Sequence, residues 1–95
     1  MQYEYVKYSG HALTQMFNRK ISKEDVRNVI DNGEVIKEYP DDKPYPSKLM
    51  LGFPNKRPVH VVLSYDTGNK TRYIITAYVP DPQLWNEDFK KKIRR

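Results

Sequence analysis

The spacing of apolar residues along this 95-residue chain changes at Gly33, and that change constrains the fold more than any other feature. Before Gly33, apolar side chains recur at intervals of three and four residues, which is the spacing of an amphipathic helix. After Gly33 they alternate at every second position, which is typical of β-strands with two different faces. The chain has no cysteine, so its fold contains no disulfide. We therefore expect residues 1–95 to form one α+β domain.

Two helices are predicted before Gly33, each with its own start signal. Ser9 is a plausible N-cap for the first helix, whose apolar stripe is Ala12, Leu13, Met16 and Phe17. Ser22 begins the second helix, and Asp25 three residues later is close to the capping-box arrangement. Gly33 is expected to end that helix as a left-handed C-cap. A short strand at 3–8 is expected to precede both helices.

The second half of the chain predicts four strands and a final short helix. The strands are expected at 34–39, 48–53, 59–65 and 71–79, and the helix at 84–93. Gly68 and Asn69 are expected to form the turn of a hairpin between the last two strands. The order is then β-α-α-β-β-β-β-α. The two N-terminal helices should cover one face of a curved antiparallel sheet.

Side chains alternate across a sheet, so parity separates the strand residues into two faces. The apolar set is expected against the helices: Leu49, Leu51, Phe53, Val59, Val61, Leu63, Tyr65, Tyr73, Ile75, Ala77 and Val79. The opposite set is Lys48, Met50, Gly52, His60, Val62, Ser64, Arg72, Ile74, Thr76 and Tyr78. This second face has two interpretations. It is an ordinary solvent-facing surface, or a mixed cationic and apolar surface that suits stacked bases beside a phosphate backbone.

The residue types on the second face suit RNA cleavage without a metal. Histidine serves as general base or acid because its pKa lies near neutrality, and His60 is the candidate. Lys48 and Arg72 would stabilise the phosphate, and Tyr78 or Tyr45 would stack on a base or donate a proton. His11 is the second titratable candidate. Its alternative role is to begin the first helix with a hydrogen bond to the backbone.

Other site chemistries have little support in the sequence. The two histidines show no metal-ligand spacing, so neither a metal nor a cofactor is expected. The longest apolar run is too short to span a membrane, and a cytoplasmic location is expected. Residues 90–95 carry five positive charges, equal to the net charge of +5. That tail is either a solvated helix end or an extension that contacts phosphates.

Several motifs together resemble a known family. They are "GHALTQMFNRK", "NGEVI", "YPDDKPYPS", "HVV" and "YVPDPQLW", spread over roughly residues 9–85. The combination resembles a bacterial and archaeal family of small domains of unknown function, which is similar to RelE- and BrnT-like ribonuclease toxins. The positions that match its pattern are His11, Arg19, Tyr39, Asp41, Tyr45, Pro46, Lys48, His60, Tyr78 and Trp85. Lys20 stands where a glycine often occurs in that family.

This resemblance implies a RelE-like fold and the toxin of a toxin–antitoxin pair. The implied activity is that of an mRNA interferase, and the implied partners are RNA and a cognate antitoxin, in some relatives of the MqsA type. The residues expected to bind nucleic acid are Tyr39, Tyr45, Arg19, Lys56 and Arg57. The alternatives are a non-catalytic RNA-binding or protein-interaction module on the same face, and a nuclease that requires a metal.

Overall fold

A computed structural model describes residues 5–93 as a five-stranded sheet with two α-helices. The strands are β1 (Tyr5–Tyr8), β2 (Glu34–Tyr39), β3 (Ser47–Gly52), β4 (Val59–Asp66) and β5 (Thr71–Tyr78). The helices are α1 (Gly10–Arg19) and α2 (Lys23–Asn32), and Pro54–Lys56 form a short 3-10 turn, η1. The α+β class is confirmed.

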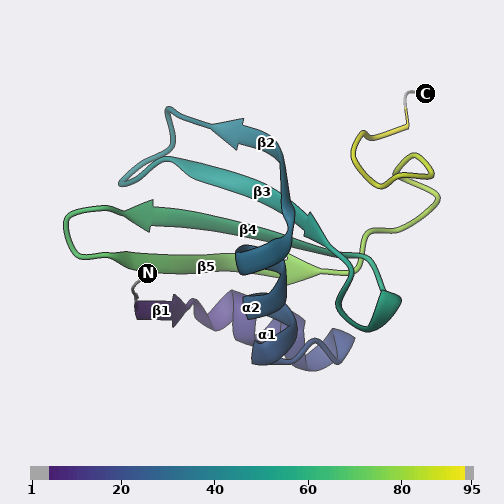
Figure 1. The fold of residues 1–95 in the computed structure, drawn as a ribbon, viewed down its shortest axis with the longest axis horizontal. Helices are drawn as coiled ribbons and strands as arrows, with labels where there is room; N and C mark the ends of the chain where they lie inside the picture. Colours follow the sequence, from purple (N-terminus) through teal and green to yellow (C-terminus); the bar gives the residue numbers. More distant parts are fainter. Residues whose placement is uncertain (1–4, 94–95) are drawn as a thin grey trace.

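The sheet is mixed rather than antiparallel, which corrects the prediction. Its strand order is β1-β5-β4-β3-β2. β1 runs parallel to β5, whereas β2 to β5 pair antiparallel with their neighbours. Because both helices intervene between β1 and β2, the chain crosses from one edge of the sheet to the other (Figure 1). The two edges are therefore built from segments that are close in sequence.

The predicted helix starts are confirmed. The Ser9 hydroxyl accepts a hydrogen bond from the Ala12 amide at 2.9 Å. Ser22 and Asp25 form the complete capping box, each side chain accepting from the other residue's amide at 3.0 Å. The apolar stripe of α1 is narrower than predicted, because Leu13 is 43% exposed and Phe17 is 84% exposed.

The left-handed position lies at the end of α1 and not at Gly33. Lys20 has φ 56° and ψ 45°, whereas Gly33 has φ −81° in the extended region. Gly33 is required for a different reason. A Cβ there would lie 2.4 Å from the Val29 carbonyl oxygen and 2.6 Å from that of Leu51. Only glycine allows the end of α2 to approach β3 this closely.

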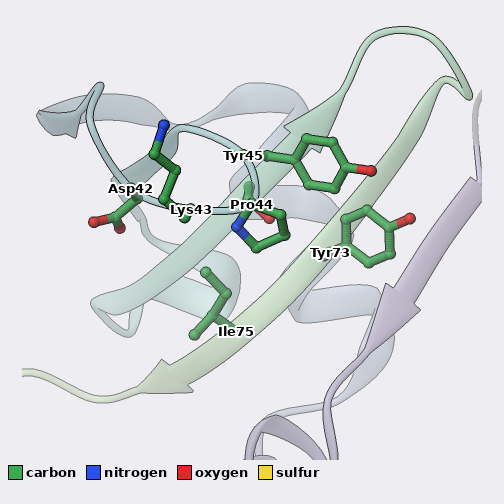
Figure 2. A pocket seen from close by; sticks show the side chains of 7 residues that line it. Asp42, Lys43, Pro44, Tyr45, Tyr73 and Ile75 are labelled. Carbon is green, nitrogen blue, oxygen red and sulfur yellow. The ribbon is translucent and has the colours of Figure 1, made fainter.

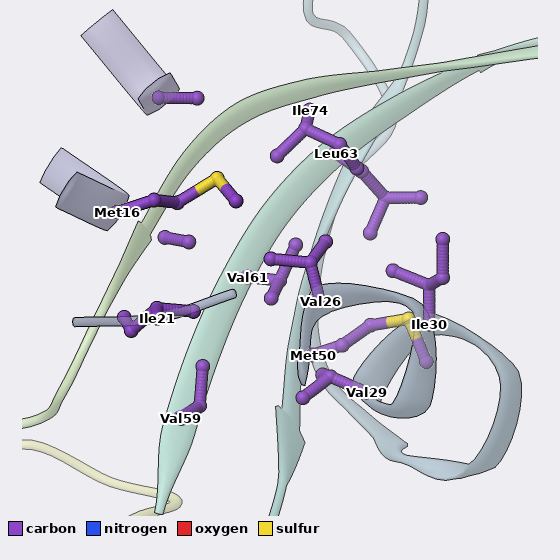
Figure 3. Close-up of a cluster of buried hydrophobic side chains, with 12 residues drawn as sticks. Met16, Ile21, Val26, Val29, Ile30, Met50, Val59, Val61, Leu63 and Ile74 are labelled. Carbon is purple, nitrogen blue, oxygen red and sulfur yellow. The ribbon is translucent and has the colours of Figure 1, made fainter. Parts of the chain in front are cut away.

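Both helices contribute to one core against the same face of the sheet (Figure 3). The buried members are Ala12, Met16, Ile21, Val26, Val29, Ile30, Met50, Val59, Val61, Leu63, Ile74 and Ala77. We call the sheet face opposite these helices the outer face. None of the helices in residues 5–93 is long and apolar enough to cross a membrane.

The pairing register overturns part of the predicted division into faces. Met50 lies opposite Val61, so Met50 and Lys48 face the helices, while Leu49 and Leu51 lie on the outer face. An irregularity in the β4–β5 pairing falls between Val62 and Leu63. This irregularity shifts the parity of β5, so that Ile74 and Arg72 face the helices. Tyr73 and Ile75 line a pocket on the outer face instead.

The predicted C-terminal helix is wrong. Residues 80–93, here called the C-terminal segment, form turns and one isolated bridge between Trp85 and Lys92. Pro80 and Pro82 disfavour a helix at the start of the segment. The segment turns back on itself after β5 (Figure 1). Its Trp85 ring meets the His60 ring on the outer face. The segment therefore covers part of the outer face.

Candidate functional site

His60 lies on the outer face, as its parity predicted, but it is completely buried. Its exposed fraction is 0%. Its ring meets the Trp85 ring edge-on, with centroids 4.4 Å apart, and the Tyr78 ring at 5.2 Å. Trp85 belongs to the C-terminal segment, which therefore separates His60 from solvent.

Both ring nitrogens of His60 have partners. Nε2 lies 2.8 Å from the Phe89 carbonyl oxygen, which can only accept, so Nε2 carries the proton and donates it. Nδ1 lies 3.2 Å from the Tyr78 hydroxyl and accepts from it in the neutral ring. Burial lowers the pKa of His60, and the Phe89 carbonyl partly opposes that effect. Burial raises the pKa of Tyr78. At pH 7 both side chains are therefore uncharged and joined by a hydrogen bond.

The lowered pKa of His60 predicts an acid-sensitive fold. As pH falls, the unfolded chain binds a proton at His60 near the ordinary pKa of 6.5. The folded chain binds that proton only at a lower pH. The contribution of His60 to stability is therefore complete above pH 6.5 and is lost as pH falls toward the lower folded pKa. We expect the free energy of unfolding to decrease below pH 6.5, by at most about 1.4 kcal/mol per pH unit from this group. Denaturant titrations between pH 7.5 and 5 measure this slope.

A His60→Gln variant provides the comparison, since its amide can still donate to Phe89 without titrating. Its stability should change less over the same interval of pH. Equal slopes in the two proteins would contradict the assignment to His60. The pKa of Asp66 is also lowered, chiefly by the Asn69 side chain, but from an ordinary value of 3.8, so it acts in a more acidic range.

Lys48 and Arg72 lie on the other side of the sheet from His60 and Tyr78, which corrects the predicted shared face. They line a pocket beneath α2 together with Ile30, Val35, Met50, Leu63 and Tyr65. Arg72 is held there by Asp31 of α2, with Nη1 and Oδ1 3.1 Å apart. These two cations cannot act on a phosphate that contacts His60, because the sheet lies between them.

The other candidate residues, His11, Arg57 and Lys56, lie on α1 or beside the two helices. His11 is exposed on the first turn of α1. The Arg57 guanidinium donates to the carbonyls of Arg19 and Lys20 at 3.0 and 2.8 Å. It also lies 3.5 Å from the Asp25 carboxylate. Arg57 therefore fastens the end of α1 to the start of α2, while Lys56 is exposed in η1.

The outer face carries a pocket of about 570 Å³ beside the β4–β5 hairpin, here called the tyrosine pocket. It is lined by Asp42, Lys43, Pro44, Tyr45, Ser64, Tyr73 and Ile75. Figure 2 shows the Tyr45 ring, from the loop between β2 and β3, beside the Tyr73 ring on β5. The two rings are stacked within 3° of parallel, with centroids 5.7 Å apart. Such paired rings offer flat apolar surfaces to a planar ligand.

The hydroxyl end of Tyr45 is anchored, which fixes the orientation of its ring. A hydrogen bond to the Asp66 carboxylate raises the pKa of Tyr45, and the charge of Asp66 adds to this effect. Asp66 is itself held by the hairpin, because it accepts from the amides of Gly68 and Asn69 at 3.0 and 3.3 Å. The turn of the hairpin thus positions one wall of the pocket.

A row of register partners connects the tyrosine pocket with the far edge of the sheet. Tyr39 pairs with Ser47, Ser47 with Ser64, and Ser64 with Tyr73. Because residues in register share a face, two tyrosines flank two small buried serines on the outer face. At a strand spacing of about 4.8 Å, Tyr39 and Tyr73 are roughly 14 Å apart. The row therefore places Tyr39 and Tyr73 on the same face of the sheet, with buried serines between them.

Tyr73 is a site residue that sequence reasoning misplaced. It was predicted to face the helices but lines the tyrosine pocket, whereas Tyr65 faces the helices as predicted and lines the pocket beneath α2. The misplacement of Tyr73 follows from the pairing irregularity between β4 and β5, which the alternation within a single strand does not show. Tyr39 and Tyr45 were identified from the sequence as candidates. Within residues 5–93, no three His, Cys, Asp or Glu side chains form a group that could hold a metal ion.

The fold and this surface define a small α+β domain whose mixed sheet presents tyrosines opposite its two helices. Residues 8–79 match a family described as a domain of unknown function, DUF4258. The chain therefore belongs to that family. The matched range ends just before the C-terminal segment. No match to this chain is found among the curated proteins or among the solved structures.

Proposed function

We propose that this protein binds single-stranded RNA on the outer face of its sheet. The observation that carries the proposal is the stacked pair of Tyr45 and Tyr73 in a pocket of about 570 Å³. Proteins that bind unpaired strands stack bases on aromatic side chains and track the backbone with cations. Lys43 at the same pocket and Lys37, whose Nζ lies 5.6 Å from the centre of the Tyr39 ring, supply such cations.

Substitution of Tyr73 by alanine tests this proposal. We expect Tyr73→Ala to weaken binding of an unstructured RNA about tenfold, since stacking of one base contributes about 1–3 kcal/mol. Tyr73→Phe should bind nearly as the wild type does, because the ring is kept. Fluorescence anisotropy with a labelled uridine-rich strand measures both affinities.

Phe17→Ala is the matched control, because Phe17 lies on α1, on the other side of the sheet, and is 84% exposed. It removes an exposed aromatic ring without changing the outer face. If Tyr73→Ala bound the strand as tightly as Phe17→Ala does, the outer face would not be the RNA site. A duplex bound as tightly as the single strand would also contradict base stacking.

A second candidate function is that of a metal-independent endoribonuclease, the toxin partner of an antitoxin protein. The observation that favours it is the hydrogen-bonded pair of His60 and Tyr78, which lies on the same outer face. Displacement of the C-terminal segment would be needed before the pair met a 2′-hydroxyl, because His60 is fully buried. Denaturing gels of the RNA from the binding experiment, run with a chelator present, separate the two candidates. Fragments that disappear in His60→Gln would favour the nuclease.

A further inference from the structure

A second pocket on the outer face, of about 370 Å³, lies between β2 and the C-terminal segment. It is lined by Ile36, Lys37, Tyr39, Leu49, Trp85, Lys90, Lys91 and Lys92, and we call it the lysine pocket. Four of its eight residues are lysines, two are aromatic and two are aliphatic. Leu49 and Trp85 are buried, with exposed fractions of 4% and 8%, so the pocket has an ordered apolar base.

The charge of this pocket is strongly positive. Lys90 forms an ion pair with Glu34, with Nζ and Oε1 3.1 Å apart, which balances one of the four cations. Lys92 Nζ lies 5.9 Å from the centre of the Trp85 ring, and Lys37 is placed similarly against Tyr39. Cations therefore stand beside both aromatic rings. An anion that also carries a planar group would contact charge and ring together.

The pocket exists because the C-terminal segment is fastened to the sheet. The bridge between Trp85 and Lys92 folds the segment into a loop, and the Asn86 amide donates to the Lys91 carbonyl at 2.8 Å. His60 fixes that loop through its 2.8 Å bond to the Phe89 carbonyl. Three of the lysines are thereby held opposite Lys37 of β2. The lysines of the C-terminal segment therefore line an ordered pocket and do not only form a charged tail.

We propose that the lysine pocket binds a phosphate monoester joined to a nucleoside. This chemistry is carried by the 5′-phosphorylated end of an RNA strand and by a free nucleoside monophosphate. A monoester carries about −1.5 to −2 charges at pH 7, whereas an internal phosphodiester carries one, so the surplus of lysines favours the monoester. The inference rests on the proposed RNA-binding function, because Tyr39 of the lysine pocket lies on the same face of the sheet as Tyr73 of the tyrosine pocket.

The single tryptophan of the chain provides the measurement, because Trp85 lines the lysine pocket. Its fluorescence can be titrated with one RNA strand in two forms, 5′-phosphorylated and 5′-hydroxyl, and separately with AMP. We expect the phosphorylated strand to bind about tenfold more tightly, the effect of one charge-assisted contact. In Lys37→Gln the two forms should bind alike.

Lys48→Gln is the matched control, since it removes the same charge from β3 on the side of the sheet that faces the helices. It should retain the preference for the phosphorylated strand. Unfolding midpoints of both variants near that of the wild type verify that the fold is intact. AMP binding that is lost in Lys37→Gln would support the proposal and identify a free nucleotide as a ligand.

Equal affinity for the two forms of the strand in the wild type would overturn the phosphate site. If RNA still bound in that case and Tyr73→Ala weakened it, the proposed RNA-binding function would stand without the lysine pocket. A preference for the phosphorylated strand that persisted in Lys37→Gln would likewise overturn the assignment to this pocket.

Discussion

Replacement of His60 by alanine should destabilise the protein by about 3–4 kcal/mol. The imidazole is fully buried and packs edge-on against Trp85. Its removal leaves a cavity and deprives the Phe89 carbonyl and the Tyr78 hydroxyl of their hydrogen-bond partner. Each effect costs about 1–3 kcal/mol on its own. Denaturant unfolding monitored by Trp85 fluorescence measures the change.

His11→Ala is the control, because His11 is exposed on α1 and its replacement should change stability by less than about 0.5 kcal/mol. Equal stabilities of the two variants would mean that His60 does not hold the C-terminal segment. The comparison also bears on function. A loss of RNA cleavage in His60→Ala has no catalytic meaning unless the variant remains folded, so His60→Gln is the better probe of chemistry.

Gly33→Ala should destabilise the protein by about 3 kcal/mol, the upper range for an overpacked site. The added Cβ would meet the carbonyl oxygens of Val29 and Leu51 at 2.4 and 2.6 Å. Both obstacles belong to the backbone, so relief requires α2 to move away from β3. Thermal or denaturant unfolding of the purified variant measures the loss.

Gly10→Ala provides the matched control, since a Cβ at Gly10 meets nothing within 4 Å. Gly10 is the first residue of α1, and alanine there should leave stability unchanged or raise it by up to about 1 kcal/mol. A loss at Gly10 equal to that at Gly33 would show that glycine flexibility, and not the close approach, sets the requirement.

The features that the sequence predicted correctly are those with a local cause. The capping box of Ser22 and Asp25 depends on four consecutive residues, and it forms as expected. The strands begin and end within a few residues of their predicted bounds because alternation and turn formers are local signals. The N-cap at Ser9 belongs to the same group.

The predictions that failed concern features that depend on residues far away in the sequence. Lys48 and His60 were placed on one face by parity, but the β3–β4 register puts Lys48 opposite Leu63 and His60 opposite Leu51. A register is set by turns and bulges, and a shift of one residue exchanges the faces. The burial of His60 comes from Phe89 and Trp85, which no pattern around His60 indicates.

β2 forms one edge of the sheet, and among residues 5–93 only β3 pairs with it. An open edge is a template on which other chains add strands and aggregate. Here a register shift between Val35 and Lys37 interrupts the strand, and Glu34, Lys37 and Glu38 are exposed along it. Charge and irregularity on an edge strand oppose the docking of a foreign strand. Lys37, which we assign to phosphate binding, would thus also protect the protein from self-association.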